Sequence, residues 1–261
     1  MTERHSHRSA LVTGASSGIG ASFARLLAAD GCALVLVARR ADRLNQLAGQ
    51  LRKQHAVDVE VLPADLATAS GLDAVAARLT GDEPIELLVN NAARSARGRF
   101  AELTPATIDA QIQLNVIALT RLAHAAAGAM LARGYGGIVN VSSMASLTAS
   151  PGTAVYGATK AFVTSLTESL YAELTGTDVH VTALLPGFTH TEFHEANDVE
   201  VSYLPSIAWL DADAVARSGL NAVALGRPLA VPGPQYKLAA SAVRLLPRAL
   251  LRHLSHRYRR A

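Results

Sequence analysis

Apolar, β-rich runs alternate with helical segments along this chain, and the alternation restricts the fold more than any single motif does. Strands separated by helices pair in parallel, because each helix returns the chain to the same edge of the sheet. A parallel strand is covered on both faces and therefore reads as a continuous apolar run, as Leu-Val-Leu-Val at 34–37 does. Such runs occupy residues 9–13, 33–38, 58–63, 87–90, 137–142, 179–184 and 229–231. Helical segments begin near residues 18, 41, 70, 105, 153 and 211. We predict an α/β fold, a doubly wound parallel sheet of about seven strands with helices on both faces.

Length and composition fit one large domain. With 261 residues, of which 50% are hydrophobic, the chain can bury one sizeable core. No repeat or linker divides it, so we assign residues 1–235 to a single domain and residues 236–261 to a C-terminal extension. The extension carries seven basic residues and no acidic one, although the net charge of the whole chain is only +3. The body is therefore acidic, which argues against nucleic acid as a partner.

Three features of the sequence bear on the cellular compartment. The polar N-terminal residues lead straight into the first strand, which leaves no room for a signal peptide. No uninterrupted apolar run approaches the roughly 20 residues that span a bilayer. Cys32 is the only cysteine, so no intrachain disulfide can form. We expect a cytoplasmic protein.

A glycine-rich turn, Thr13-Gly14-Ala15-Ser16-Ser17-Gly18-Ile19-Gly20, separates the first predicted strand from the first helix. A side chain at its glycines would obstruct the turn, a ligand or the packing of the helix. The helix N-terminus attracts negative charge, so a pyrophosphate can lie against this backbone. An isolated turn of this kind can serve structure alone, but its place between strand and helix favours a dinucleotide in a Rossmann-type domain. The expected cofactor-binding residues here are Gly14, Ser16, Ser17, Gly18, Ile19 and Gly20.

The residues after the second and third strands indicate which dinucleotide binds. An NAD-binding domain usually carries an acid after the second strand, whereas this chain has Arg39 and Arg40. Guanidinium groups bind a 2′-phosphate that a carboxylate would repel, so NADP(H) is preferred over NAD(H). Arg39 is the better candidate, since Arg40 can equally be a solvated residue that opens the next helix. Asp65, followed by Leu66, is placed to receive the adenine amino group or to cap the next helix.

Tyr156 and Lys160 stand at i and i+4 of a predicted helix, so their side chains share one face. A phenol has a reference pKa of about 10 and is a poor acid or base at neutral pH, but a neighbouring ammonium is expected to lower that pKa. Ser143, at the end of the fifth strand, can hold a substrate oxygen beside Tyr156. Singly these residues could be a surface pair and a strand-end cap. With the glycine turn they predict redox chemistry between a carbonyl and an alcohol.

These motifs together resemble the classical short-chain dehydrogenase/reductase (SDR) family, over the chain to about Gly233. The resemblance rests on T-G-x-x-x-G-x-G at 13–20, Asn-Asn-Ala-Ala at 90–93, Asn115, Ser143, Tyr156-x-x-x-Lys160, and Pro186-Gly187. One departure is Ala93, where the family has glycine. The resemblance implies that Asn115 joins the catalytic set and supports a water that links the lysine to solvent. It also implies cofactor contacts from Asp65, Leu66, Asn91, Ala92, Tyr156, Lys160, Pro186, Gly187, Thr189 and Thr191.

The family places a mobile substrate lid after the sixth strand, at residues 188–210 of this chain. Several of the few aromatic residues fall here, including Phe188, Phe193 and Trp209. An apolar substrate such as a steroid, an acyl chain or an aromatic ketone is therefore favoured, although packing over the core explains any single aromatic equally well. His190 and His194 also lie in this stretch, but no third ligand is apparent and we expect no metal site.

The extension 236–261 is predicted to form a basic amphipathic helix. Arginines at 244, 248 and 252 recur every four residues beside leucines at 246, 250 and 254. Such a helix can pack on a partner subunit, make peripheral contact with an anionic membrane, or cover the active site of its own chain. We favour subunit packing. Alanine-rich helices around residues 118–129 and 161–172 also suit close packing, so we expect a homodimer or homotetramer.

The sequence thus predicts an NADP(H)-dependent oxidoreductase that reduces a carbonyl to a secondary alcohol, or the reverse, on a small apolar substrate. Tyr156 is the expected acid or base, Ser143 orients the substrate oxygen, and Lys160 tunes Tyr156. A protein of the same fold that senses NADP(H) or scaffolds partners without turnover is the alternative. The intact set of Asn115, Ser143, Tyr156 and Lys160 argues against that alternative.

Overall fold

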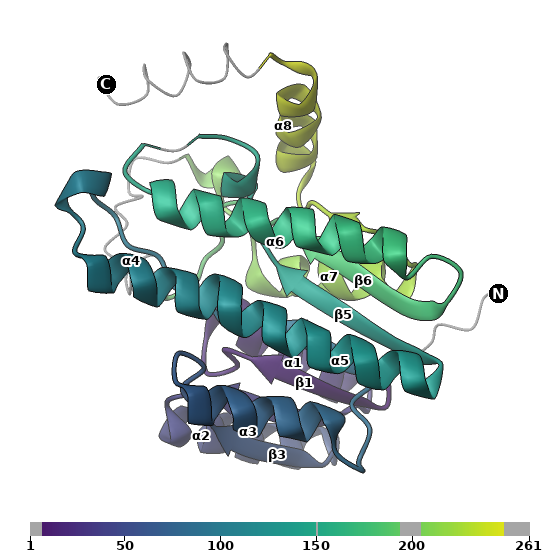
Figure 1. The fold of residues 1–261 in the computed structure, drawn as a ribbon. Coiled ribbons are helices and arrows are strands. Elements are labelled where there is room, and N and C mark those ends of the chain that lie inside the picture. The colour runs from purple at the N-terminus through teal and green to yellow at the C-terminus, as the bar shows by residue number, and fades with distance from the viewer. Residues whose placement is uncertain (1–6, 150, 194–204, 248–261) are drawn as a thin grey trace.

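The structure, a computed structural model, describes residues 7–149, 151–193 and 205–247, and these contain the predicted sheet (Figure 1). Parallel strands are hydrogen bonded in the order β3-β2-β1-β4-β5-β6-β7. Their bounds lie close to the predicted ones: β1 (Ser9–Thr13), β2 (Ala33–Ala38), β3 (Val59–Pro63), β4 (Leu87–Asn90), β5 (Tyr135–Val141), β6 (Asp178–Leu184) and β7 (Leu229–Ala230). The doubly wound α/β fold is confirmed.

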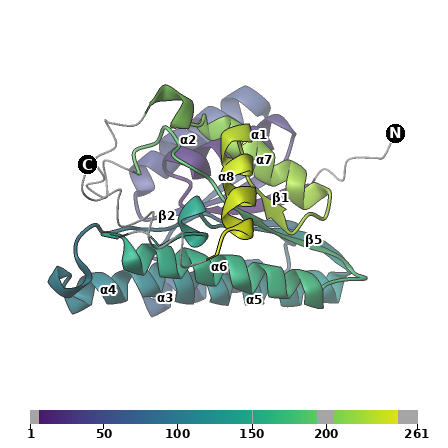
Figure 2. The ribbon, with the colours of Figure 1, turned by 90° about the horizontal axis from the view of Figure 1, so that it is seen from above.

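Helices cover both faces of the sheet (Figure 2). One layer holds α1 (Gly18–Ala29), α2 (Ala41–His55) and α7 (Ala212–Ala224). The opposite layer holds α3 (Ala69–Thr80), α4 (Pro105–Ile112), α5 (Leu119–Arg133) and α6 (Ala154–Glu173). Short 3₁₀ turns, η1 (Phe100–Glu102), η3 (Met144–Ser146) and η5 (Ser206–Ala208), lie in the connecting loops. As the sequence indicated, Thr104 caps α4 by accepting the Thr107 N–H, and Pro105 occupies the first turn.

The helix expected to begin near residue 105 does begin there, and it continues as a long stretch that is not α-helical throughout. α4, the π-helical segment η2 (Gln113–Ala118) and α5 follow one another without a break through residue 133. This stretch is long and apolar enough to cross a membrane by length and composition. Its residues Leu122, Ala126 and Met130 are, however, buried against the sheet, which is how a core helix packs.

The order of the sheet brings the predicted site residues together. The strand order reverses at β1 and β4, and in such folds ligands bind at the carboxyl ends beside this switch point. A buried chain of hydrogen bonds runs inward from β4: Asn90 Nδ2 donates to Asn140 Oδ1 at 3.0 Å, and Asn140 Nδ2 donates to Thr167 Oγ1 at 3.0 Å. Since an unpaired buried amide is costly, this chain fixes α6 relative to β4 and β5.

The last described helix, α8 (Pro234–Leu245), differs from the predicted extension. We expected a separate helix over residues 236–261, but the observed helix begins at Pro234 and ends at Leu245. Leu246 is extended (ψ 139°), because a residue that precedes proline disfavours the α conformation and Pro247 follows. The stripe residues from position 248 onward lie outside the described residues.

Candidate active site

A cleft of about 1070 Å³ lies at the carboxyl edge of the sheet, where loops that follow six of the strands meet. Most of the predicted site residues line it: Gly14, Ser16, Ser17, Gly18, Ile19, Arg39, Arg40, Asp65, Leu66, Asn91, Ala92, Ser143, Tyr156, Lys160, Pro186, Gly187, Thr189 and Thr191. Gly20 and Asn115 are not among the residues that line it. The structure therefore brings the nucleotide and proton-transfer candidates into one cavity.

The glycine turn is held against the end of β4. Asn91 Nδ2 donates to the backbone carbonyls of Thr13 at 3.0 Å and Gly14 at 3.4 Å, while Thr13 Oγ1 accepts the N–H groups of Asn91 and Ala92. Gly14 has φ +66°, and a Cβ there would lie 2.8 Å from Asn91 Nδ2. A Cβ on Gly20 would overlap the Gly14 carbonyl oxygen. Gly20 thus permits helix α1 to approach β1, and contributes no wall to the cleft.

The chain after β6 returns over the same turn. Gly18 has φ +54°, and a Cβ there would lie only 3.0 Å from Thr191 Cβ. Thr189 is buried, and the Pro186 carbonyl accepts the Met144 N–H at 3.0 Å. The loops after β1, β5 and β6 therefore form one continuous wall, and the glycines keep its surface free of side chains where a pyrophosphate would pass.

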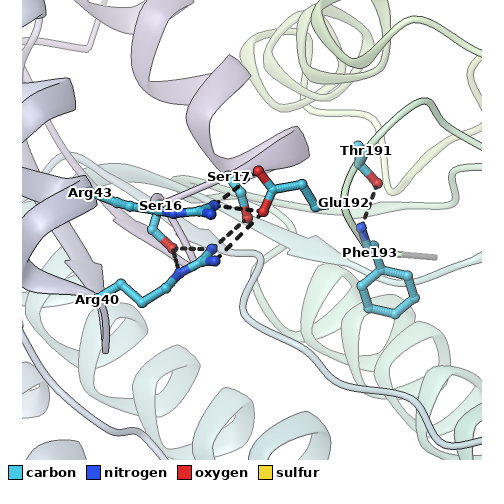
Figure 3. Close-up of polar contacts among 7 residues, drawn as sticks. All are labelled: Ser16, Ser17, Arg40, Arg43, Thr191, Glu192 and Phe193. Atoms are coloured by element: carbon cyan, nitrogen blue, oxygen red, sulfur yellow. Dashed lines mark hydrogen bonds and ion pairs between the residues drawn. The ribbon is translucent and has the colours of Figure 1, made fainter. Parts of the chain in front are cut away.

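Arg40 contacts the glycine turn directly (Figure 3). Its guanidinium donates to Ser16 Oγ at 3.0 and 3.3 Å and to Ser17 Oγ at 3.0 Å. Arg39, which the sequence favoured over Arg40, also lines the cleft but forms no hydrogen bond or ion pair within the described part of the chain. The side chain of Glu192, which the sequence did not single out, lies 3.6 Å from the Arg40 guanidinium.

The turn after β3 places Asp65 and Leu66 on the cleft. Asp65 Oδ1 accepts the Ala67 N–H at 3.0 Å, and the Asp65 carbonyl accepts the Thr68 hydroxyl at 2.9 Å. Thr68 caps α3 by accepting the Gly71 N–H, so Asp65 is not the helix cap. Leu66 is mostly buried and also belongs to the core under α3.

Ser143, Tyr156 and Lys160 meet at the end of β5. Ser143 Oγ accepts the Ala145 N–H at 3.1 Å and is hydrogen bonded to the Tyr156 side chain. Lys160 is only 2% exposed, and its Nζ donates to the Val141 carbonyl at 2.7 Å. The same Nζ lies 5.8 Å from the centroid of the Tyr156 ring. A hydroxyl, a phenol and an amine thus converge on one side of the cleft.

Burial shifts the pKa values of the tyrosine and the lysine in opposite directions. It raises the pKa of Tyr156 from 10.0 to about 12, which the hydrogen bond from Ser143 offsets only in part. It lowers the pKa of Lys160 from 10.5 to about 7. We predicted that Lys160 would lower the pKa of Tyr156, but desolvation outweighs any such effect. The phenol is therefore protonated at neutral pH, and the lysine is near its midpoint.

Asn115 lies in η2 and is fully buried. Its Oδ1 accepts the Arg94 N–H at 2.9 Å, and its Nδ2 donates to the Arg94 carbonyl at 2.8 Å and to Thr159 Oγ1 at 3.1 Å. These bonds connect the loop after β4 to α6 at Thr159, the residue before Lys160. Asn115 therefore positions the elements around the site, and the water link implied by the family resemblance stays a prediction.

The predicted lid, 188–210, is described only at its two ends, because residues 194–204 lie outside the described part. The Phe193 ring lies 6.0 Å from the Tyr156 ring between centroids, and Phe188 lies 6.1 Å from Trp209. His190 stacks on Trp209 at 4.6 Å. No group of three His, Cys, Asp or Glu side chains placed for a metal occurs in 7–149, 151–193 or 205–247, and His194 is not described.

Helix α8 also lines the cleft, through Tyr236, Ala239 and Val243. The Tyr236 hydroxyl accepts the Phe188 N–H at 3.0 Å and donates to the Ala208 carbonyl at 2.6 Å. Its ring covers Gly187, where any Cβ would overlap it. The Gly233-Pro234 pair signalled a helix start, but no local signal said where that helix would pack. Of the roles left open for the extension, its first turns cover the active site of their own chain.

Comparison with known proteins agrees with this geometry. Residues 8–201 match the profile of the family described as short chain dehydrogenase. A short-chain dehydrogenase from Sphingobium yanoikuyae, solved in complex with NADPH, is 38% identical with a TM-score of 0.84 over 90% of this chain and 92% of that chain. The bulky-bulky ketone specific alcohol dehydrogenase from Comamonas testosteroni is 34% identical with a TM-score of 0.80 over 91% and 92%.

A curated relative, sulfoacetaldehyde reductase from Chromohalobacter salexigens, is 38% identical over 185 residues, which cover 70% of this chain and 72% of the relative. The names of the last two proteins, a ketone specific alcohol dehydrogenase and a sulfoacetaldehyde reductase, differ in the compound acted on. The profile match over most of the chain, together with the similarity to solved members, shows that this protein belongs to the short-chain dehydrogenase/reductase family of oxidoreductases.

Proposed function

We propose that the protein is an NADP(H)-dependent oxidoreductase acting on CH–OH/C=O groups, which reduces the carbonyl of a small apolar substrate to a secondary alcohol. The observation that carries the proposal is the convergence of Ser143, Tyr156 and Lys160 in the cleft that begins at the glycine turn. A protein that only sensed the dinucleotide would not need a phenol, a hydroxyl and a buried lysine at one place.

The groups at the end of β2 fit NADP(H) better than NAD(H). Solved relatives carry NADPH or NAD, so family membership leaves the choice open. In this chain Arg39 and Arg40 follow β2 and line the cleft. The side chains of Ser16 and Ser17 lie beside Arg40, so hydroxyls and guanidinium groups are available to one phosphate. When bound, NADPH supplies the hydride, and the chain supplies binding groups and the proton.

The shifted pKa values favour proton donation. A phenol with a pKa of about 12 carries its proton at neutral pH, so the Tyr156 hydroxyl can donate to a carbonyl oxygen as negative charge develops there. Ser143, which is hydrogen bonded to Tyr156, can donate to the same oxygen. A protonated Lys160 would stabilise the phenolate that remains. Reduction is therefore the direction that these groups serve best.

An apolar substrate is supported by the apolar part of the cleft lining. Several apolar side chains line the cleft: Met144, Phe188, Phe193, Ala239 and Val243. Arg94 and Arg97 also line it, so an anionic carbonyl compound is the informative contrast to an apolar ketone. By their names, the relatives act on a bulky ketone in one case and on sulfoacetaldehyde in another.

Replacing Tyr156 by Phe tests the proton donor. We expect NADPH-dependent reduction, followed by nicotinamide absorbance on a panel of steroid, acyl, aromatic and anionic carbonyl compounds, to fall by about 10²–10⁴-fold. NADPH binding, measured by fluorescence titration, should change little. Tyr171→Phe, on the exposed side of α6, is the matched control and should keep full activity. Undiminished turnover by Tyr156→Phe would refute the mechanism, and tight NADPH binding without any turnover by the natural protein would favour a sensor.

Replacing Arg39 by Ala tests the cofactor preference. Loss of one charge-assisted contact should weaken NADPH binding by about tenfold and leave NADH binding nearly unchanged. Lys53→Ala, an exposed basic position on α2, controls for the change in net charge. Titrations with both dinucleotides measure the effect, and equal losses for NADPH and NADH would contradict a role at the 2′-phosphate.

The lowered pKa of Lys160 predicts a pH dependence of stability. Its folded pKa of about 7 lies below the ordinary 10.5, so the unfolded chain binds more protons between these values and stability rises with pH there. This group should contribute up to about 1.4 kcal/mol per pH unit to the free energy of unfolding. The free energy of unfolding, measured by urea denaturation at about pH 7 to 9, should rise less steeply with pH in Lys160→Met than in the natural protein. Lys53→Met should keep the natural slope. Parallel slopes for all three proteins would exclude a depressed lysine pKa.

Exposed apolar side chains support a homodimer or homotetramer. Leu131 on α5 and Phe162 on α6 are 47% and 42% exposed, and the two helices lie side by side on one face (Figures 1 and 2). Light scattering should report a dimer or tetramer, and Phe162→Asp should lower the mass while Leu225→Asp, at the end of α7 on the other face, should not. A monomeric natural protein would contradict this expectation. A cytoplasmic location stays a prediction, and no observation supports the membrane contact.

A further inference from the structure

A carboxylate lies where the expected 2′-phosphate has to be recognised. Arg43 donates through one nitrogen to both carboxylate oxygens of Glu192, at 2.6 and 2.9 Å, and Arg40 lies 3.6 Å from the same carboxylate (Figure 3). Arg40 simultaneously donates to the hydroxyls of Ser16 and Ser17. Two guanidinium groups and two hydroxyls are thus gathered at the entrance to α2, with an acid from the chain after β6 among them.

This donor set suits a phosphate better than a carboxylate. Guanidinium forks and hydroxyls match the three oxygens of a phosphate monoester, which also carries the larger charge. The position also fits, because Arg40 follows β2, where dinucleotide-binding folds hold the ribose 2′ position. Glu192 and a 2′-phosphate therefore require the same arginines, and two anions cannot share them without repulsion.

Glu192 is linked through the chain to the proton donor. Its neighbour Thr191 packs against Gly18 of the glycine turn. The other neighbour, Phe193, donates its N–H to Thr191 Oγ1 at 3.3 Å and places its ring 6.0 Å from that of Tyr156. Glu192 therefore stands between a residue that packs on the glycine turn and a residue whose ring lies beside the phenol, so these three residues are the route by which its displacement would reach both places.

The ion pairs of Glu192 with the two arginines are weak enough for a ligand phosphate to replace the carboxylate. The side chains of Arg40, Arg43 and Glu192 are 44%, 40% and 52% exposed, and ion pairs in such settings are weak and screened by salt. The hydrogen bond from Arg43 lowers the pKa of Glu192, so the carboxylate stays charged at neutral pH. A ligand phosphate can therefore replace it without the large desolvation cost that separating a buried pair carries.

We propose that Glu192 is a cofactor-specificity residue, an internal anion that occupies Arg40 and Arg43 and must be displaced by the 2′-phosphate of NADP(H). This inference rests on the proposed NADP(H) function. Displacement exchanges one arginine partner for another and releases residues 191–193 from the glycine turn, so that phosphate recognition is coupled to the surroundings of Tyr156. A dinucleotide without the phosphate leaves the Glu192 contacts in place.

Adenosine 2′,5′-bisphosphate and 5′-AMP test the competition without any chemistry. In Glu192→Gln, which keeps the side-chain shape and removes the charge, calorimetry should show 2′,5′-bisphosphate binding tightened by about two- to fivefold, the range that a weak exposed ion pair allows. Binding of 5′-AMP should be unchanged. Glu83→Gln, an exposed acid paired with Arg78 away from the cleft, is the matched control and should alter neither affinity.

Hydrogen exchange tests the coupling. In the natural protein, the bisphosphate but not 5′-AMP should speed amide exchange in a peptide spanning residues 189–193, and Glu192→Gln should show the faster exchange without ligand. Unchanged or weaker bisphosphate binding in Glu192→Gln, or equal tightening of 5′-AMP, would overturn the inference. The proposed NADP(H)-dependent function would still stand. Failure of both NADPH and the bisphosphate to bind the natural protein would instead overturn the proposed cofactor and this inference with it.

Discussion

The hydrogen bonds that join the carboxyl ends of β1 and β4 are the constraint on which the cleft depends. The Asn91 side-chain amide donates to the carbonyls of Thr13 and Gly14, and the Thr13 hydroxyl oxygen accepts backbone N–H groups just after β4. This junction leaves no volume for a Cβ at Gly14 or Gly20, so α1 starts directly against the strand ends. The same closeness leaves helix α1 with its N-terminal amides facing the cleft, where an anion is favoured. A structural demand of the fold and a demand of ligand binding are thus met by the same glycines.

The sequence predicted features that arise from local physics. Continuous apolar runs located the strands, since burial on both faces requires them, and Thr104-Pro105 located a helix start. Features that arise from long-range contacts were missed. Tyr236 joins the cleft because its hydroxyl finds partners 28 and 48 residues earlier, and Glu192 meets Arg43 across 149 residues. The predicted direction of the Tyr156 pKa shift was wrong for the same reason. Helical spacing shows that a lysine is near the phenol, but it does not show how deeply both groups are buried.

The burial of Tyr156 and Lys160 explains how this pair of side chains can hold and transfer a proton. Desolvation penalises the charged form of either group. It therefore keeps the phenol protonated and uncharged, and it lowers the pKa of the lysine to about 7. A neutral phenol is ready to give a proton, and a lysine near its midpoint can carry or release one at small cost. Lys160 is fixed while it does so, because Val141 accepts its hydrogen bond and Asn115 holds the adjacent turn of α6 through Thr159. Positioning by buried bonds and tuning by burial are therefore two consequences of one packing arrangement.

The two ends of the cleft contrast in how firmly their charged groups are held. At the Tyr156 end the contacts are buried, so moving one partner would leave a polar group without water or protein to bind it. At the Arg40 end the partners are half exposed, so water can replace any contact that is given up. The half-exposed groups can exchange partners when an anion binds, whereas proton transfer requires groups that stay in place. The segment from Thr191 to Phe193 connects these regimes, since Glu192 at its centre contacts the exchangeable arginines and the ring of Phe193 lies 6.0 Å from that of the fixed phenol.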